Sequence, residues 1–306
     1  MDGQTRGRGQ PAVELRGVHK TFGSTEALRG IDLHVEPGEL VAMLGPNGAG
    51  KTTAISLMLG LRRATSGDVQ LFGLPPSDRR ARWRRGVMLQ DSGVPGTLTV
   101  REIIDLFRTY YPAPLESDAA IDLAGLDAQA RTPASKLSGG QRQRLYFALA
   151  VVGDPDALFL DEPTVAMDVA ARRAFLASIA AFAEGGKTIV LTTHDLDEAD
   201  VLARRVVVID RGLVIADDTP ERLKARVPGR RVRFRPERTL PHAWSAGLPV
   251  SGLDEDNGIV HFLSNEPEEV LAALFARDVH VRDLEVAGAS LEEAFLAITS
   301  SQGVLQ

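Results

Sequence analysis

The feature that most restricts the possible folds is an octapeptide near the start of the chain. Residues 45 to 52 read Gly-Pro-Asn-Gly-Ala-Gly-Lys-Thr and match the pattern G-x-x-x-x-G-K-[ST] at every fixed position. The apolar run Leu40–Leu44 before it predicts a buried strand, and the segment Thr52–Leu59 after it predicts a helix. A strand, a glycine-rich loop and a helix in this order predict an α/β fold that binds phosphate at the loop.

The residue types in this octapeptide suit a triphosphate. Glycines let the backbone curl until its N–H groups face the phosphates, and the helix N-terminus adds positive potential. Lys51 is then expected to reach the β- and γ-phosphates, and Thr52 to bind Mg²⁺. A glycine-rich turn that precedes a helix by chance is the competing interpretation, and the complete motif argues against it. The other residues expected to bind the ligand here are Gly45, Pro46, Asn47, Gly48, Ala49, Gly50 and Thr53.

A pair of acidic residues marks the end of a second apolar strand. Asp161 and Glu162 follow the run Ala157–Leu160, and a parallel α/β sheet presents its ligands at the carboxyl ends of its strands. Asp161 suits the Mg²⁺ shell, and Glu162 suits polarising a water for attack on the γ-phosphate. Adjacent strand residues point to opposite faces, so the two acids need not share a role. Acids often follow strands because loops are solvated, so the pair gains its meaning from the phosphate loop.

Between these two elements lies the segment Leu137-Ser138-Gly139-Gly140-Gln141. With the phosphate loop and the Asp-Glu pair, it makes the chain resemble the ATP-binding cassette (ABC) family from about Val13 to Thr219. The resemblance implies that this segment, the family's signature, closes over an ATP molecule held by a second protomer. Ser138 and the two glycine amides can offer donors to a γ-phosphate. Without the resemblance, the segment is a helix N-cap with a flexible entry.

The resemblance also implies roles for four single residues. Phe22 resembles the aromatic residue that stacks on adenine, while an ordinary core Phe fits the sequence as well. Gln90 resembles the glutamine that senses Mg²⁺ and connects the nucleotide to an inserted helical subdomain. Asp168 occupies the position of the loop Asp that couples two nucleotide sites across a dimer. His194 follows a β-branched strand and matches the switch histidine that contacts the γ-phosphate.

The loop before Asp168 departs from the family's common Gly-Leu-Asp pattern. It carries Ala166 and Met167 in place of the Gly and the Leu. Both replacements are tolerable in volume. The loop is therefore expected to keep its shape, provided that its backbone needs no positive φ at Ala166.

Composition limits the classes of function. The net charge of −6 argues against nucleic acid as the main partner. The arginine-rich stretch Arg79–Arg85 could contact RNA or lipid headgroups, but a solvated helix anchored by Trp83 is favoured in so acidic a chain. The absence of cysteine excludes disulfides, thiolate metal sites and a Cys nucleophile. No apolar run approaches the length of a membrane span, so a cytoplasmic location is expected.

The pattern of elements predicts the fold class α/β: a P-loop NTPase-type mixed sheet with a helical subdomain insert, plus a small C-terminal α+β domain. We expect a disordered tail at 1–10, an ATPase domain at 11–227 with the helical insert at about 92–155, and an accessory domain at 228–306. Strands of the ATPase domain are expected at Val13–Val18, Ile31–Val35, Leu40–Leu44, Val69–Phe72, Val87–Gln90, Leu158–Asp161, Thr188–Leu191 and Val206–Ile209. Accessory strands are expected at Arg231–Arg235, Gly258–Leu263 and Val279–Val286, and helices at Glu266–Ala276 and Leu291–Ile298.

The resemblance implies an ATP-binding and ATP-hydrolysing transporter subunit that uses Mg²⁺. Two copies are expected to close around two ATP molecules, with a heterodimer as the alternative to a homodimer. The partner is a separately encoded integral-membrane permease, which holds the subunit on the inner face of the cell membrane. The segment Leu291–Leu296 resembles the tail of bacterial ABC-2 type, daunorubicin-resistance-like exporters of drugs and lipids, so export is expected.

Two other classes of protein compete with this interpretation. A DNA-repair or ribosome-associated ATPase of the same family is expected to carry a long coiled-coil insert or two tandem cassettes, and the sequence shows neither. A generic phosphate-loop GTPase or kinase leaves the signature at Leu137–Gln141 unexplained.

Overall fold

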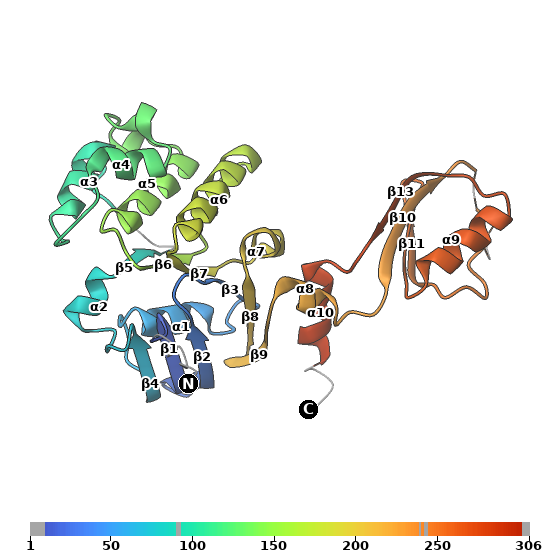
Figure 1. Cartoon of the computed structure of the whole chain (residues 1–306), viewed down its shortest axis with the longest axis horizontal. Coiled ribbons are helices and arrows are strands. Elements are labelled where there is room, and N and C mark those ends of the chain that lie inside the picture. The colour runs from blue at the N-terminus through green and yellow to red at the C-terminus, as the bar shows by residue number, and fades with distance from the viewer. Residues whose placement is uncertain (1–9, 90–92, 239, 242–243, 302–306) are drawn as a thin grey trace, which may run out of the picture. The chain divides into compact units, whose positions relative to one another are not determined.

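The chain folds into two compact units, Met1–Thr219 and Pro220–Gln306. A computed structural model describes residues 10–89, 93–238, 240–241 and 244–301, and Figure 1 labels the elements of both units. No helix in this described part of the chain has both the length and the apolar character needed to cross a membrane.

A six-stranded sheet forms the centre of the first unit. Its first five strands in spatial order are parallel, and the last runs antiparallel to its neighbour, which confirms the predicted mixed sheet with a parallel core. Every residue of its three inner strands β6, β7 and β3 is buried, as expected for strands covered on both faces. The order is β5 (Arg85–Met88), β6 (Ala157–Asp161), β7 (Thr188–Thr192), β3 (Leu40–Leu44), β8 (Arg205–Asp210) and β9 (Leu213–Asp218).

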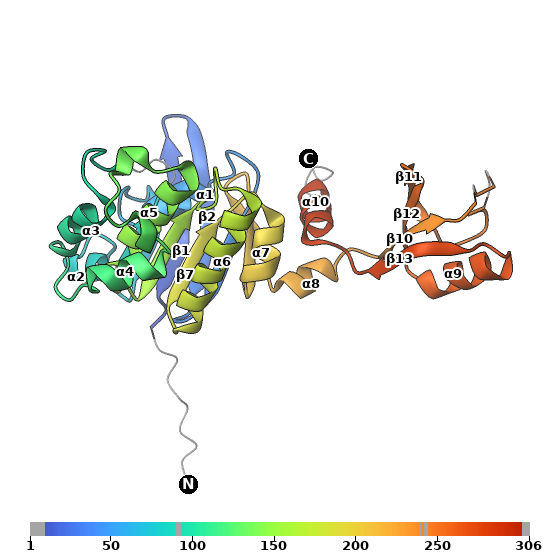
Figure 2. The same cartoon turned by 90° about the horizontal axis from the view of Figure 1, so that it is seen from above.

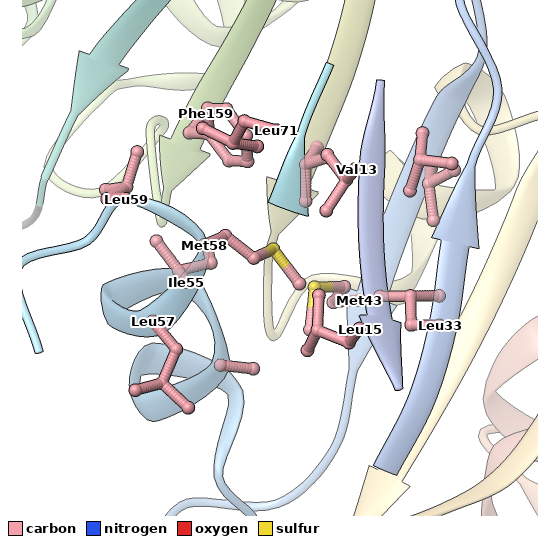
Figure 3. Packing of buried hydrophobic residues seen from close by; sticks show 14 of the residues in the cluster. Val13, Leu15, Leu33, Met43, Ile55, Leu57, Met58, Leu59, Leu71 and Phe159 are labelled. Atoms are coloured by element: carbon pink, nitrogen blue, oxygen red, sulfur yellow. The ribbon is translucent and has the colours of Figure 1, made fainter. Parts of the chain in front are cut away.

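A second, antiparallel sheet packs with helix α1 (Lys51–Met58) around one hydrophobic core. Its strands lie in the order β2 (Thr25–Val35), β1 (Val13–Phe22) and β4 (Ser66–Leu71). Figure 3 shows Leu15 and Leu33 from this sheet close to Met43 of β3 and Met58 of α1. Each such buried side chain contributes about 1.5–3 kcal/mol. The core therefore fixes both elements that flank the phosphate loop.

The helical insert begins after β5. Its elements are α3 (Val100–Arg108), α4 (Ser117–Leu123), the 3₁₀ turns Asp127–Gln129 and Ala134–Lys136, and α5 (Gly139–Val151), while the short α2 (Arg79–Trp83) precedes β5. Helix α5 packs against β5, where a Cβ at Gly86 would lie only 2.0 Å from the carbonyl oxygen of Ala150. This close approach requires a glycine. It anchors the helix that begins at the signature to the edge of the central sheet.

Two further helices cover the sheet beside α5. They are α6 (Val169–Glu184) and α7 (Leu196–Leu202), and they pack against each other. Helix α6 also contacts α5, where Phe147 and Phe175 meet edge to face with ring centroids 5.2 Å apart. In Figures 1 and 2, α5 and α6 lie on the side of the six-stranded sheet opposite to α1 and the antiparallel sheet.

The second unit contains a four-stranded antiparallel sheet in the order β11 (Ser251–Asp256), β12 (Ile259–Ser264), β10 (Arg230–Pro236) and β13 (Val281–Ala287). Helix α9 (Pro267–Ala276) packs on it through a small core around Phe234, Phe262 and Trp244. Helices α8 (Pro220–Lys224) and α10 (Leu291–Ser301) contact each other. The sequence did not predict β11, because all six of its residues are exposed and carry no apolar alternation.

Candidate functional site

A cavity of about 470 Å³ collects the residues that the sequence analysis placed around a nucleotide. Its volume lies within the range of about 300–1,000 Å³ typical of small-ligand sites. The phosphate loop, the carboxyl end of β6 and the segment after β7 all contribute to its wall. The lining residues are Ala27, Asn47, Gly48, Ala49, Gly50, Lys51, Thr52, Thr53, Asp161, Glu162, Val165 and His194.

The backbone of the phosphate loop depends on glycine at both ends. Gly45 has a φ of 155°, and a Cβ there would lie 2.1 Å from the carbonyl oxygen of Ile209. Gly50 has a φ of 113° and directly precedes α1, where a Cβ would lie 2.8 Å from the carbonyl oxygen of Ala27. The first turn of α1 follows Gly50 at the cavity wall. This end of α1 can therefore bind an anion.

Lys51 is almost fully buried, with 8% of its surface exposed. Its Nζ donates to the carbonyl oxygen of Gly45 at 2.6 Å and to that of Pro46 at 3.3 Å. Burial lowers the pKa of Lys51, while the negative charges of Glu162 and Asp161 oppose that shift. A phosphate at this position would give the ammonium group an anionic partner in place of neutral carbonyls.

Asp161 and Thr52 supply oxygen atoms of the kind that Mg²⁺ prefers. Asp161 is 4% exposed, and the hydroxyl of Thr192 donates to its Oδ1 atom. Both Asp161 and Thr52 line the cavity. Within the described ranges, no group of three or more His, Cys, Asp or Glu residues can hold a metal ion. One carboxylate and one hydroxyl fit Mg²⁺, because that ion is usually held by one or two protein oxygens together with substrate phosphates and water.

Glu162 and His194 meet at the cavity wall. The Nδ1 atom of His194 lies 2.5 Å from Oε2 of Glu162, and the Glu162 N–H donates to the carbonyl oxygen of Thr192 at 3.1 Å. Glu162 has a φ of 52°, in the left-handed region that a non-glycine residue seldom occupies. Strain of this kind concentrates at functional positions, where the surrounding structure holds it. The side chain of Glu162 is thus held at the cavity wall beside His194.

The signature segment begins α5 outside this cavity. Ser138 caps the helix: its Oγ accepts from the Gln141 N–H at 3.3 Å, and Gln141 Oε1 accepts from the Ser138 N–H at 3.0 Å. A Cβ at Gly139 would lie 3.3 Å from the carbonyl oxygen of Ala166, which places the signature against the loop before Asp168. Among the described residues that line the cavity, none belongs to the signature.

The loop before Asp168 corrects one expectation. Ala166 has a φ of 66°, so the condition for an unstrained loop, an ordinary φ at this position, is not met. An L-residue in this region costs about 1–2 kcal/mol, which a glycine would avoid. The carboxylate of Asp168 caps α6 by accepting from the Ala171 N–H at 2.8 Å.

Comparisons with known proteins agree with this geometry. The sequence profile described as "ABC transporter" matches residues 28–165. The chain is 34% identical over 310 residues to Nod factor export ATP-binding protein I of Paraburkholderia xenovorans (strain LB400), covering 96% of this chain and 98% of the relative. The chain belongs to the ABC transporter family. A protein of the same name from Cupriavidus metallidurans is 35% identical to this ABC subunit over 298 residues, covering 95% and 98% of the two chains.

A solved structure of the family shares the fold of the first unit. It is a dimeric ATP-binding cassette in a post-hydrolysis state, bound to ADP and Pi. Its TM-score to this ABC subunit is 0.62 at 26% identity, with 68% of this chain and 98% of that chain covered. The chain is accordingly an ABC ATPase, a protein that binds and hydrolyses ATP.

Gly45, Pro46 and Asp168, like the signature, do not line the cavity. Two further sequence-predicted residues of this ABC ATPase lie away from the cavity or outside the described part of the chain. Phe22 ends β1, is 39% exposed and does not line the cavity. The Lys20 ammonium and the Arg62 guanidinium lie 4.9 Å and 5.0 Å from its ring centroid. At these distances both cations are attracted to the electron-rich ring. Gln90 lies outside the residues that the structure describes.

The sequence analysis missed two residues of the cavity wall. Ala27 lies in β2 and Val165 in the loop after Glu162. Neither residue type carries a chemical signal, so only the path of the backbone could reveal them. The same is true of Thr192, whose hydroxyl holds Asp161 from the neighbouring strand.

Proposed function

We propose that this ABC ATPase powers export through a separate integral-membrane permease and works as a dimer around two Mg-ATP molecules. The observation that carries the proposal is the single cavity in which Lys51, Asp161, Glu162 and His194 meet the phosphate loop. The relatives that align with nearly the whole chain are named export ATP-binding proteins, which supports export as the direction of transport. The permease would hold the subunit at the inner face of the membrane.

The cavity residues divide the chemistry among them. The loop N–H groups and Lys51 bind the β- and γ-phosphates, with Asn47 to Thr53 forming the wall. Thr52 and Asp161, with Gln90 as a third candidate, would hold Mg²⁺, which supplies positive charge at the phosphates when bound. Glu162 accepts a proton from the attacking water, and His194 contacts the γ-phosphate beside it.

The position of the signature supports the proposed dimer. Ser138 and the amides of Gly139 and Gly140 form a helix N-terminus suited to phosphate, yet none of them lines the cavity of their own chain. A nucleotide on a second copy can meet these donors. Asp168, which caps α6 next to the signature, would then lie at the contact between the two sites.

The DNA-repair or ribosome-associated alternative is not favoured. The two relatives described above align with 95% or more of the chain, so the similarity to export ATP-binding proteins extends over both units. Adenine would stack on Phe22, whose ring also has the Lys20 ammonium and the Arg62 guanidinium near it.

The mass of the Glu162→Gln protein in solution tests the proposal. Without its catalytic carboxylate the protein should bind Mg-ATP, fail to hydrolyse it and change from monomer to dimer. The control is the same variant with Lys51→Ala, which should raise the Kd for ATP about 10- to 100-fold and stay monomeric. A Glu162→Gln protein that is saturated with ATP and still monomeric would contradict closure between two copies.

A further inference from the structure

A buried acid lies behind the catalytic residues. Glu198 in α7 is 2% exposed and follows His194 by one helical turn. It does not line the nucleotide cavity. A fully buried carboxylate is costly unless other polar groups surround it. The polar groups around the Glu198 carboxylate therefore indicate its role.

Glu198 contacts the polypeptide on both sides of the Glu162–His194 pair. Its Oε2 atom accepts from the hydroxyl of Thr193 at 3.0 Å, and Thr193 directly precedes His194. Thr164, two residues after Glu162, is a second buried hydroxyl beside this carboxyl and lowers its pKa. Thr193 is 1% exposed, so its hydrogen bond to Glu198 is made out of contact with solvent.

The Thr193 hydroxyl holds the turn that carries His194. The same Oγ that donates to Glu198 accepts from the N–H of Asp195 at 2.9 Å. This hydrogen bond closes a tight turn with His194 as its middle residue. Glu198 accepts the hydrogen bond of the Thr193 hydroxyl, so the lone pairs of that hydroxyl oxygen stay directed at the Asp195 N–H. The position of His194 thus depends on Glu198.

An arginine from α6 completes the network. Arg172 places Nε 3.5 Å from Oε1 of Glu198 and Nη1 2.5 Å from Oδ2 of Asp195. The backbone N–H of Arg172 donates to the carbonyl oxygen of Asp168 at 2.8 Å, which is the ordinary hydrogen bond of the first turn of α6. The guanidinium therefore links α6 to Asp195, the N-cap of α7, and lies beside Glu198 as an ion pair without a hydrogen bond between Nε and Oε1. Burial raises the pKa of Glu198, and the two threonine hydroxyls and Arg172 oppose that shift.

An apolar side chain would fill this space without the cost of desolvating a charge. We propose that Glu198 is a positioning residue for ATP hydrolysis: through Thr193 it holds the turn that places His194 beside Glu162. This inference rests on the proposed function, because it assigns Glu198 a role in the reaction of that site. Glu198 acts through Thr193, and Arg172 is its charge partner.

Steady-state kinetics of two substitutions test this role. Glu198→Leu removes all the polar contacts at similar volume and should lower kcat about 10- to 100-fold, because small displacements of catalytic groups have effects of this size. The Kd and KM for ATP should stay within about twofold, because the phosphate loop is untouched. Glu198→Gln keeps an acceptor for Thr193 and should recover part of the loss. A Glu198→Leu protein with wild-type kcat would overturn the proposal.

A double-mutant comparison separates positioning from general destabilisation. If Glu198 acts through His194, Glu198→Leu should lower kcat by less than about twofold in a His194→Ala background, because coupled residues are not additive. If the loss of kcat in the double variant equals the product of the two single losses, the proposal is overturned. Ile179→Val, at a buried position of α6, is the matched control: it should lower thermal stability and leave kcat unchanged.

The two proposals fail in different ways. If the wild-type protein hydrolyses ATP and Glu162→Gln abolishes the activity, a normal rate for Glu198→Leu rejects only the role of Glu198. If the wild-type protein does not hydrolyse ATP under conditions where it binds Mg-ATP, the proposed function itself is rejected.

Discussion

The two units place unusual backbone conformations at different kinds of positions. In the ATPase unit, Glu162 and Ala166 have φ values of 52° and 66°, and both lie in the segment that borders the nucleotide cavity. In the accessory unit, Asn257, Asp278 and Asp283 have φ values of 51°, 57° and 52°. Asn and Asp tolerate this region well, whereas Glu and Ala do not.

The difference shows what each unit requires of its backbone. Two of the accessory residues serve tight connections: Asn257 joins β11 to β12, and Asp278 follows α9. Asp283 lies inside β13, where the pairing with β10 is irregular. The ATPase unit also has turn residues with positive φ, such as Asp154 and Arg211, but Glu162 and Ala166 serve the site itself. Packing around β6 and β7, whose residues are all buried, keeps these two residues in place. Two of the strained residues of the ATPase unit therefore belong to the site, while others, such as Phe72 and Arg211, lie in turns.

The strongest test of this contrast removes one carboxylate from each unit. Glu162→Gln should lower the rate of ATP hydrolysis about 10²- to 10⁴-fold, the range expected for loss of a general base. The control is Glu237→Gln in the accessory unit, an exposed acid paired with Arg282 at 2.8 Å, which should leave the rate unchanged. Phosphate release measured at saturating Mg-ATP decides the matter. Equal rates of ATP hydrolysis for the two variants would show that Glu162 is not the general base.

The core of the accessory unit can be disturbed without touching the nucleotide cavity. Phe234→Ala should destabilise that unit by about 3–5 kcal/mol, because it empties a fully buried aromatic site between Trp244 and Phe262. Urea unfolding followed by Trp244 fluorescence, in a Trp83→Phe background, measures the effect. Phe275→Ala, on the exposed side of α9 at 52% exposure, should change stability by at most about 0.5 kcal/mol. A parallel loss of ATP binding in Phe234→Ala would show that the two units do not unfold independently.

The strain at Ala166 predicts a substitution that stabilises the ATPase unit. Ala166→Gly should raise its stability by up to about 1 kcal/mol, because relief of the left-handed conformation exceeds the added chain entropy. This corresponds to an increase in Tm of about 2–4 °C for a unit of this size. Ala174→Gly, at an exposed position inside α6, should have the opposite sign and cost about 1 kcal/mol. A decrease in Tm for both variants would contradict strain at Ala166.

The smallest effect concerns the pH dependence of stability. Burial raises the pKa of Glu198 above its usual 4.5, against the hydrogen bonds from Thr164 and Thr193 and the charge of Arg172. A carboxyl whose pKa is raised by folding stabilises the fold fully below its unfolded value and loses that contribution as the pH rises through its folded value. The wild-type protein should therefore lose stability relative to Glu198→Gln as the pH rises from about 4.5. Urea unfolding of both proteins at a series of pH values measures the difference in their free energies of unfolding. The prediction fails if the wild-type protein gains stability relative to Glu198→Gln as the pH rises.

The sequence was most informative where side-chain type and backbone context agree. The apolar runs of β3, β6 and β7 predicted strands because these strands are buried on both faces. The phosphate loop, Asp161 and Glu162 were predicted from a motif whose spacing has a chemical reason, and the structure brings them to one cavity. β11 was missed because its six exposed residues, Ser251–Asp256, show no alternation.

Contacts between distant segments could not be predicted from one sequence. Glu198 and Arg172 lie on different helices, and only folding shows that the arginine pairs with the buried carboxylate of Glu198. The positive φ of Ala166 was left as a condition, because backbone angles follow from tertiary packing as well as from residue type. The contact of the signature with Ala166 likewise needed coordinates.

The contact between Gly45 and the Ile209 carbonyl has a consequence for how the protein is made. The phosphate loop is synthesised early, but the hairpin of β8 and β9 that it packs against leaves the ribosome much later. The Gly212 N–H also donates to the carbonyl oxygen of Ala49 at 2.9 Å, so the hairpin holds both halves of the loop. A nascent chain that ends before Gly212 lacks this support. The newly made protein therefore gains its nucleotide site only when nearly the whole ATPase unit has emerged.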